Sequence, residues 1–467
     1  MARYESWGCY PKIKNQQVQP LLWTHEAPSL QSCAQNVLPH GYGRSYGDSC
    51  LNEGGILLDT TGINRFLSFD SATGLLRCES GVSLHEIIKT LAPHGWFLPV
   101  TPGTKYVSVG GAIANDVHGK NHHLAGTFGC HVRGFELLRS DGTRRYCSLD
   151  THPDLFQATI GGLGLTGLIL WADIQLKHIP NQWITAERVK FSHVEDFYEL
   201  SFQSERDFEY TVAWIDCFAS VEKLGRGIFI RGNHNNQPNA PHAQKFRKTI
   251  QVPCNVPSYF LNTKTLKIFN ALYYHSAPKC KGPHHESFDQ FFYPLDSILD
   301  WNRLYGNRGF LQYQCVIPPE HQKEGIKKVL RTIQESGQGS FLAVLKQFGN
   351  LPSPGLLSFP RPGTTLALDF AYQGPKTLNL LNTLDDMVMD YGGAVYPAKD
   401  ARMSPSHFQQ FFPHWDTFKK FVDPKFSSSF WRRVTNCSHS QACSDQNFIT
   451  NPNTYSPAVP EFIATSR

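Results

Sequence analysis

This 467-residue chain lacks several features that would assign it to a common class. No run approaches the ~20 apolar residues of a membrane-spanning helix, and the longest apolar stretch, residues 164–174, predicts a buried strand. Residues 1–6 lack the apolar core of a signal peptide, so we expect a cytoplasmic protein. The net charge is only +5 and no basic stripe occurs, which argues against nucleic-acid binding. An anionic substrate or a lipid-phosphate surface stays compatible with this charge.

Metal-binding and disulfide patterns are also missing. The twelve cysteines include no C-x-x-C pair, and their spacing suggests reduced thiols. His118 and His122 have the His-x-x-x-His spacing that binds zinc on a helix, but Gly119 interrupts it and no suitably spaced Cys or Glu completes the set. We therefore expect no metal, and a structural role is one alternative for His122 and His123.

The length predicts two or three domains. Residues 1–182 alternate short strands with turns and a few helices. Ser83 and Glu86 form a capping box before a helical apolar pattern, and Asp141-Gly142 indicates a hairpin. Residues 183–393 are rich in aromatics and predict antiparallel strands with covering helices at 321–335 and 378–391. Residues 394–435 form a compact C-terminal segment, and 436–467 an irregular tail.

Two glycine-rich segments, residues 41–48 and 110–123, carry the strongest signal. Glycine lets backbone N–H groups approach an anion closely, and successive N–H groups form a concave anion site. Two such loops suit a diphosphate cofactor better than a single phosphate. Arg44, beside two turn glycines, is well placed for phosphate, although a surface salt bridge is an alternative.

These loops occur in order with four further blocks, at residues 102–104, 161–167, 310–314 and 398–400. Together they resemble the FAD-linked oxidases of the vanillyl-alcohol-oxidase type, which have a PCMH-type FAD-binding domain, over residues 5–434. The resemblance implies an α+β fold. A two-piece FAD-binding domain would occupy residues 1–182, a substrate domain with a helix-covered antiparallel sheet 183–393, and a segment returning to the flavin 394–435.

The resemblance also implies cofactor contacts. They are expected from Gly41, Gly43, Arg44, Ser45, Tyr46, Gly47, Asp48, Gly103, Ser108, Gly110, Gly111, Asn115, His118, Gly119, Leu168 and Tyr396. Relatives with covalent flavin often carry His where Arg44 stands, and Arg cannot form a histidyl–flavin bond, so we expect noncovalent FAD. The stretch between Trp23 and His40 is shorter than the usual first strand–helix–strand unit, which predicts a different geometry there.

For catalysis the resemblance implies Lys399, Tyr396, His118 and Gln314. A cation such as Lys399 stabilises the negative charge of a reduced flavin, although a lysine is more commonly a solvated surface residue. The expected substrate-binding residues are Gln312, Gln314, Lys346, Trp214 and Phe292.

Gln312 and Gln314 would share one face of a strand and suit a polyhydroxylated sugar, the alternative being a solvent-facing strand. For Trp214 and Phe292 the alternative is core packing.

The implied function is oxidation of a sugar hydroxyl to a ketone by hydride transfer to flavin N5. Within the family, the chain is most similar to oxidases of polyprenylphosphoryl ribose, which implies the 2′-hydroxyl as the target and a partner ketoreductase that completes epimerisation to arabinose. Peripheral contact with the inner membrane would follow, through aromatic loops near residues 259–261 and 273–274. The alternatives are an aldonolactone or alditol oxidase acting on a free sugar, and a flavin-binding protein without turnover.

Overall fold

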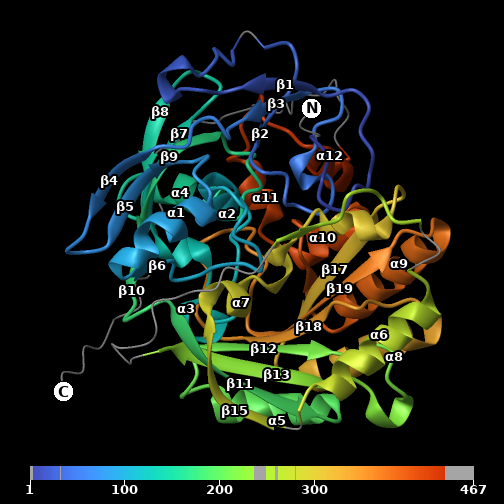
Figure 1. The fold of residues 1–467 in the computed structure, drawn as a ribbon. Helices are drawn as coiled ribbons and strands as arrows, with labels where there is room; N and C mark the ends of the chain where they lie inside the picture. Colours follow the sequence, from blue (N-terminus) through green and yellow to red (C-terminus); the bar gives the residue numbers. More distant parts are fainter. Residues whose placement is uncertain (1–3, 32, 236–248, 258–260, 279, 437–467) are drawn as a thin grey trace.

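The computed structural model describes residues 4–31, 33–235, 249–257, 261–278 and 280–436. Figure 1 shows the N-terminal third of the chain in the upper and left part of the molecule, and a large antiparallel sheet below it. The predicted α+β fold is confirmed. Within the described residues, no helix combines the length and apolarity needed to cross a lipid bilayer.

The first N-terminal piece is a three-stranded parallel sheet with the order β1 (Gln17–Pro20), β3 (Ile56–Asp59), β2 (Val37–His40). Parallel strands are usually joined by a crossover helix. Here the described residues of the β1–β2 link form only the 3₁₀ turn η1 (Thr24–Glu26), as the short sequence before His40 predicted. A second 3₁₀ turn, η2 (Asp48–Cys50), ends the first glycine loop.

The second piece is a five-stranded antiparallel sheet. Its order is β4 (Phe66–Asp70), β5 (Leu75–Glu79), β9 (Leu168–Gln175), β7 (Val132–Leu138), β8 (Arg144–Cys147). The associated helices are α1 (Leu84–Leu91), α2 (Val109–Ala114), α3 (His122–Ala125), α4 (Pro153–Thr159), η3 (Ala92–His94) and η4 (Phe128–His131). A small pair is formed by β6 (Trp96–Phe97) and β10 (Lys177–His178).

Local sequence signals explain several of these elements. The Glu86 backbone N–H donates to Ser83 Oγ at 3.1 Å and the Ser83 N–H to Glu86 Oε2 at 2.8 Å, which confirms the capping box of α1. The apolar residues Leu84, Ile87 and Ile88 are buried beneath it. The predicted hairpin is formed by β7 and β8.

The third sheet has eight antiparallel strands. Its order is β15 (Cys280–Ser287), β11 (Trp183–Phe191), β13 (Gly227–His234), β12 (Tyr210–Ile215), β18 (Ala343–Phe348), β19 (Gly363–Ala371), β17 (Phe310–Ile317), β20 (Ala394–Val395). Helices α5 (Val194–Ser204), α8 (Gln322–Ser336) and α9 (Pro375–Asp390) pack on one face of it. The two predicted helical segments correspond to α8 and α9.

The remaining elements of this part of the chain lie between β12 and β17. They comprise η5 (Val221–Lys223), β14 (Ile250–Gln251), α6 (Thr263–Ser276), α7 (Phe288–Phe292), η7 (Pro294–Ser297), β16 (Ile298–Leu299) and η8 (Trp301–Tyr305). Three of their aromatic side chains, Tyr273, Phe292 and Trp301, line the cavity described below.

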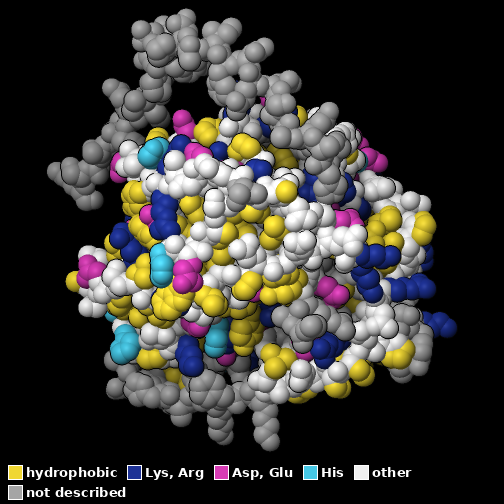
Figure 2. Space-filling view, turned by 90° about the horizontal axis from the view of Figure 1, so that it is seen from above, with side chains coloured by type: hydrophobic (Ala, Val, Ile, Leu, Met, Phe, Trp, Pro, Cys, Tyr) yellow, Lys and Arg dark blue, Asp and Glu magenta, His cyan; other side chains and the backbone are white. Residues whose placement is uncertain are grey.

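The C-terminal segment connects the large sheet to the first piece. After β20, helices α10 (Pro405–Phe411), α11 (Trp415–Lys419) and α12 (Ser429–Thr435) follow. Phe426 forms a β-bridge with Val37, and α12 packs against η2. Figure 2 shows the molecule from above, with Lys and Arg side chains interspersed among Asp and Glu.

Candidate functional site

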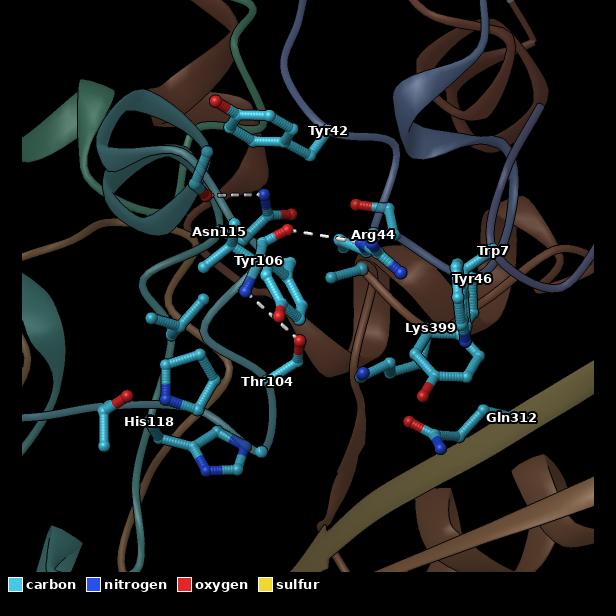
Figure 3. A pocket seen from close by; sticks show the side chains of 18 of the residues that line it. Trp7, Tyr42, Arg44, Tyr46, Thr104, Tyr106, Asn115, His118, Gln312 and Lys399 are labelled. Atoms are coloured by element: carbon cyan, nitrogen blue, oxygen red, sulfur yellow. Dashed lines mark hydrogen bonds between the residues drawn. The ribbon is translucent and has the colours of Figure 1, made fainter. Parts of the chain in front are cut away.

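A cavity of about 480 Å³ lies between the N-terminal pieces and the open face of the eight-stranded sheet (Figure 3). This volume is within the range of ligand sites. Side chains of β12, β17 and β18 reach it, because residues such as Gln312 and Gln314 alternate with core residues such as Tyr313.

Both glycine loops border this cavity. Gly41, Gly43, Arg44, Ser45 and Tyr46 line it from the first loop. Gly43 has a φ of +62°, a conformation that favours glycine. A Cβ on Gly41 would lie 2.3 Å from Ser108 Oγ, so a larger residue would displace the Ser108 side chain that caps α2.

The second loop presents backbone at the start of α2. Ser108 caps this helix by accepting from the Gly111 N–H at 3.2 Å. Gly103 faces open space, since a Cβ there would meet nothing within 4 Å. The remaining predicted cofactor residues of this wall also line the cavity, namely Gly110, Gly111, Asn115, His118, Gly119 and Leu168.

Gly47 and Asp48 lie elsewhere. Neither lines the cavity. A Cβ on Gly47 would lie 1.7 Å from the Asp400 carbonyl oxygen, and Asp48 is buried in an ion pair with Arg433. Both residues join the first loop to the C-terminal segment.

Arg44 lies between two aromatic rings, as Figure 3 shows. Its guanidinium carbon is 4.1 Å from the centroid of Trp7 and 5.7 Å from that of Tyr106, and its Nε donates to the Tyr106 carbonyl at 3.2 Å. Desolvation lowers the pKa of Arg44, although Asp296 and Asp300 oppose the shift. No ion pair within 4.0 Å involves Arg44 among the residues that the structure describes, so its charge is available to a bound anion.

Lys399 lies on the opposite side of the cavity from His118 (Figure 3). Its Nζ is 3.9 Å from the centroid of Tyr46. Desolvation lowers its pKa to about 7, and the charge of Asp369 opposes this. Asp369 is buried behind Gln312, whose Nε2 donates to Asp369 Oδ1 at 2.6 Å.

His118 is buried between two polar partners. Its Nε2 lies 2.9 Å from Gln314 Nε2, and its Nδ1 lies 3.1 Å from Lys346 Nζ. Desolvation, reinforced by the charge of Lys346, holds the pKa of His118 well below its usual value. The imidazole is therefore uncharged at neutral pH. Tyr396 lies nearby and donates its hydroxyl hydrogen to the Asn115 carbonyl at 2.7 Å.

The predicted substrate residues reach the same cavity. Gln312, Gln314, Lys346, Trp214 and Phe292 all line it. Trp214 Nε1 donates to the Phe341 carbonyl at 2.9 Å, which fixes the indole. Phe292 also packs against Tyr210 at 4.7 Å between ring centroids, so it belongs to the core as well.

His122 and His123 contact backbone outside the cavity. His122 Nδ1 accepts from the Gly349 N–H at 3.2 Å, and His123 Nε2 lies 3.1 Å from the Phe208 carbonyl oxygen. Among the described residues, no three His, Cys, Asp or Glu side chains are grouped as a metal site.

Sequence reasoning missed several wall residues. Trp7, Tyr106, Lys120 and Tyr273 all line the cavity. Lys120 stood within the second glycine loop, and its position directly after the predicted contact residues His118 and Gly119 was a usable signal. Nothing in the sequence indicates that Trp7 and Tyr106 would enclose Arg44.

The residues present fit FAD. A diphosphate needs backbone donors and a cation, and the glycine loops with Arg44 provide both in one cavity. A flavin ring that gains negative charge needs a nearby cation. Lys399 supplies one, and it forms no ion pair with a carboxylate among the described residues.

Comparison with known proteins agrees with this assignment. The model of the FAD binding domain family matches residues 30–148. Decaprenylphosphoryl-β-D-ribose oxidase of Mycolicibacterium smegmatis is 38% identical over 86% of this chain and 89% of the relative. An uncharacterised protein from the mprA 5′ region of Streptomyces coelicolor is 31% identical over 76% of this chain and 100% of the relative. L-Gulonolactone oxidase of Mus musculus is 31% identical, but over only 37% of this chain and 38% of the relative.

The long match to the mycobacterial protein, together with the FAD-binding domain, gives both the cofactor and the class of enzyme. This chain is an FAD-dependent oxidoreductase that belongs to the family of decaprenylphosphoryl-β-D-ribose oxidase.

Proposed function

We propose that this protein oxidises the 2′-hydroxyl of a polyprenylphosphoryl ribose to a ketone. The observation that carries the proposal is the convergence of Lys399, His118 and Gln314 on one cavity bordered by both glycine loops. The relative that covers most of the chain is named for oxidation of a decaprenylphosphoryl ribose. Bound FAD would supply the acceptor for the hydride that leaves the sugar carbon.

The two glycine loops and Arg44 would hold the cofactor diphosphate. Ser108 and Asn115 brace the second loop, because Asn115 Nδ2 donates to the Gly111 carbonyl at 2.8 Å. Tyr396 ties this loop to the C-terminal segment. The loop is thus held in place before a ligand binds.

The hydroxyl proton requires an acceptor at the cavity. His118 is uncharged, which suits it to accept this proton, and Lys346 Nζ lies 3.1 Å from its Nδ1. Gln312 and Gln314 would orient the sugar ring by hydrogen bonds from the same strand face. The proton acceptor would thus lie on one wall of the cavity, and Lys399, which would stabilise the reduced flavin, on the other.

The product is the most direct chemical test of this proposal. A polyprenylphosphoryl ribose incubated with the holoenzyme should lose two mass units, and borodeuteride should then place deuterium on the sugar C2′. A separate ketoreductase that returns hydride to the opposite face would give arabinose. Deuterium at another carbon would contradict the assignment of the 2′-hydroxyl.

FAD is expected to be bound noncovalently, because Arg44 stands where a flavinylated histidine would be needed. Acid or heat precipitation should release yellow FAD into the supernatant, one equivalent per chain. Colour that stays with the precipitated protein would show a covalent bond.

Helix α6 is the proposed contact with the lipid surface. Ile268, Phe269, Leu272 and Tyr273 form an exposed apolar stripe at i, i+4 spacing, and Tyr273 also lines the cavity. Lys264 and Lys267 are exposed on the same helix and suit anionic head groups. Tyr274 is buried and cannot contribute, and Tyr259 and Phe260 lie outside the described residues.

We expect Leu272→Ser, and more strongly Ile268→Ser with Leu272→Ser, to weaken binding to anionic vesicles. Each aliphatic side chain contributes about 1.5–3 kcal/mol when it is fully buried. Because these side chains would be only partly inserted, we expect the double variant to bind the vesicles at least tenfold more weakly. Leu149→Ser is the matched control, since Leu149 is 61% exposed but lies between β8 and α4. Equal vesicle binding by the α6 variants and the wild type would exclude this helix.

A further inference from the structure

Lys120 and Lys346 bring two amino groups, which an anionic ligand would hold in their charged form, to the cavity without a carboxylate partner. The lysines that form ion pairs among the described residues are Lys105, Lys177 and Lys327. Lys120 and Lys346 belong to none of these pairs, and both line the cavity. Buried charges are normally paired, so two unpaired ammonium groups facing one space point to an anionic ligand.

The contacts that the two ammonium groups do make are with uncharged partners. Lys346 Nζ lies 3.1 Å from His118 Nδ1 and 3.5 Å from the Gly119 carbonyl oxygen. Lys120 Nζ donates to the Phe291 carbonyl and lies 4.5 Å from the centroid of that ring.

The charge of Glu286 also acts on Lys120, but Glu286 already forms an ion pair with Arg188 at 3.0 Å. Its charge is therefore already compensated.

The two lysines are positioned by separate elements. Lys346 projects from β18, and the Lys120 carbonyl accepts from the Thr211 N–H at 2.9 Å, which joins the second glycine loop to β12. Desolvation lowers the pKa of each lysine to about 7, and for Lys346 the charges of Lys120 and Lys399 add to the effect. The two lysines are neighbours at the cavity, because Lys346 Nζ lies 3.5 Å from the carbonyl oxygen of Gly119, the residue before Lys120. An anion between the two would relieve their repulsion.

We propose that Lys120 and Lys346 together bind the phosphate group of the prenyl phosphate substrate. This inference rests on the proposed function and names the part of the substrate that these residues recognise. In this assignment Arg44 and Lys399 remain for the cofactor. Figure 3 shows both on the other side of the cavity from His118, the partner of Lys346, although the charge of Lys399 also acts on Lys346. Aromatic residues near the pair, Phe292 and Trp214, would border the first part of the prenyl chain.

The probe for this site is farnesyl phosphate, with farnesol as the same chain without phosphate. Isothermal titration of the FAD-loaded enzyme would compare the wild type with Lys120→Met and Lys346→Met. Charge-assisted hydrogen bonds predict a loss of about 10- to 100-fold in farnesyl phosphate affinity for each variant, with farnesol binding unchanged. Lys120→Arg and Lys346→Arg should retain most of the affinity, and Lys327→Met on the exposed face of α8 is the control.

A second readout is proton uptake. Because an anion raises the pKa of a neighbouring ammonium group, binding of farnesyl phosphate at pH 7.5 should take up protons in the wild type. Titrations in buffers of different ionisation enthalpy measure this uptake, and each Met variant should show less of it. A purely structural role of the lysines would leave proton uptake and the preference for phosphate unaltered.

The proposal is overturned if the wild type binds farnesyl phosphate no better than farnesol, or if both FAD-loaded Met variants bind it as the wild type does. Oxidation of the sugar is measured separately, by flavin bleaching. Bleaching without lysine-dependent phosphate binding would leave the proposed function standing and remove only the phosphate site. Lysine-dependent binding without bleaching by any ribosyl substrate would leave the phosphate site standing and remove the proposed function.

Discussion

Lys399→Met should reduce the rate of flavin reduction by about 100- to 1,000-fold while FAD stays bound, since a preorganised charge at the reacting group is typically worth this much. The side chain lies at the cavity with its Nζ 3.9 Å from the centroid of Tyr46. No ion pair to a described carboxylate neutralises it, so its charge acts on the ligand. Methionine keeps the apolar stem and removes only the cation.

The measurement is anaerobic rapid mixing with a polyprenylphosphoryl ribose, followed at the visible flavin band. Lys399→Arg retains a positive charge and should recover part of the rate. The flavin reduction potential of Lys399→Met should also fall, which a merely structural effect would not produce. Reduction at the wild-type rate in Lys399→Met would remove this residue from the mechanism.

Arg433→Met should destabilise the folded protein by about 3–5 kcal/mol, the usual cost of breaking a buried ion pair from one side. Arg433 donates to Asp48 at 2.7 and 2.9 Å and to Asp400 at 2.9 Å, and both carboxylates are buried. Desolvation raises the pKa of Asp400, but the charges of Arg433 and Arg402 outweigh it and hold the pKa below its usual value. Removing Arg433 would therefore leave buried charge uncompensated.

Urea unfolding of the holoenzyme measures the effect, and Arg331→Met on the exposed face of α8 is the control. Because Asp48 is the last residue of the first glycine loop, FAD should also dissociate faster from Arg433→Met. Adding Asp48→Asn to Arg433→Met should restore part of the lost stability. A change below about 0.5 kcal/mol, typical of surface substitutions, would show that this ion-pair cluster does not hold the C-terminal segment.

The sequence predicted those parts of the fold that local chemistry determines. Ser83 and Glu86 identify the start of α1 because a capping box needs only three residues of spacing. The glycine loops were recognisable because glycine is used where the backbone closely approaches another group. Gly41, for example, lies against the Ser108 side chain. Alternation along β17 likewise placed Gln312 and Gln314 on one face, and both line the cavity.

Other contacts depend on the tertiary structure and were not predictable in this way. Asp48 ends a loop whose first residues line the cavity, yet its partner Arg433 is 385 positions away. The enclosure of Arg44 by Trp7 and Tyr106 similarly joins three separate segments. Tyr273 and Tyr274 are adjacent in sequence, but the helical rotation between them exposes the first and buries the second.

The central claim is tested most directly by the absorption spectrum of the holoenzyme mixed anaerobically with candidate sugars. A polyprenylphosphoryl ribose should bleach the visible flavin band, whereas a free pentose, an alditol and an aldonolactone at the same concentration should leave it unchanged. Bleaching by the free sugars alone would contradict the account and identify the protein as an oxidase of a soluble sugar.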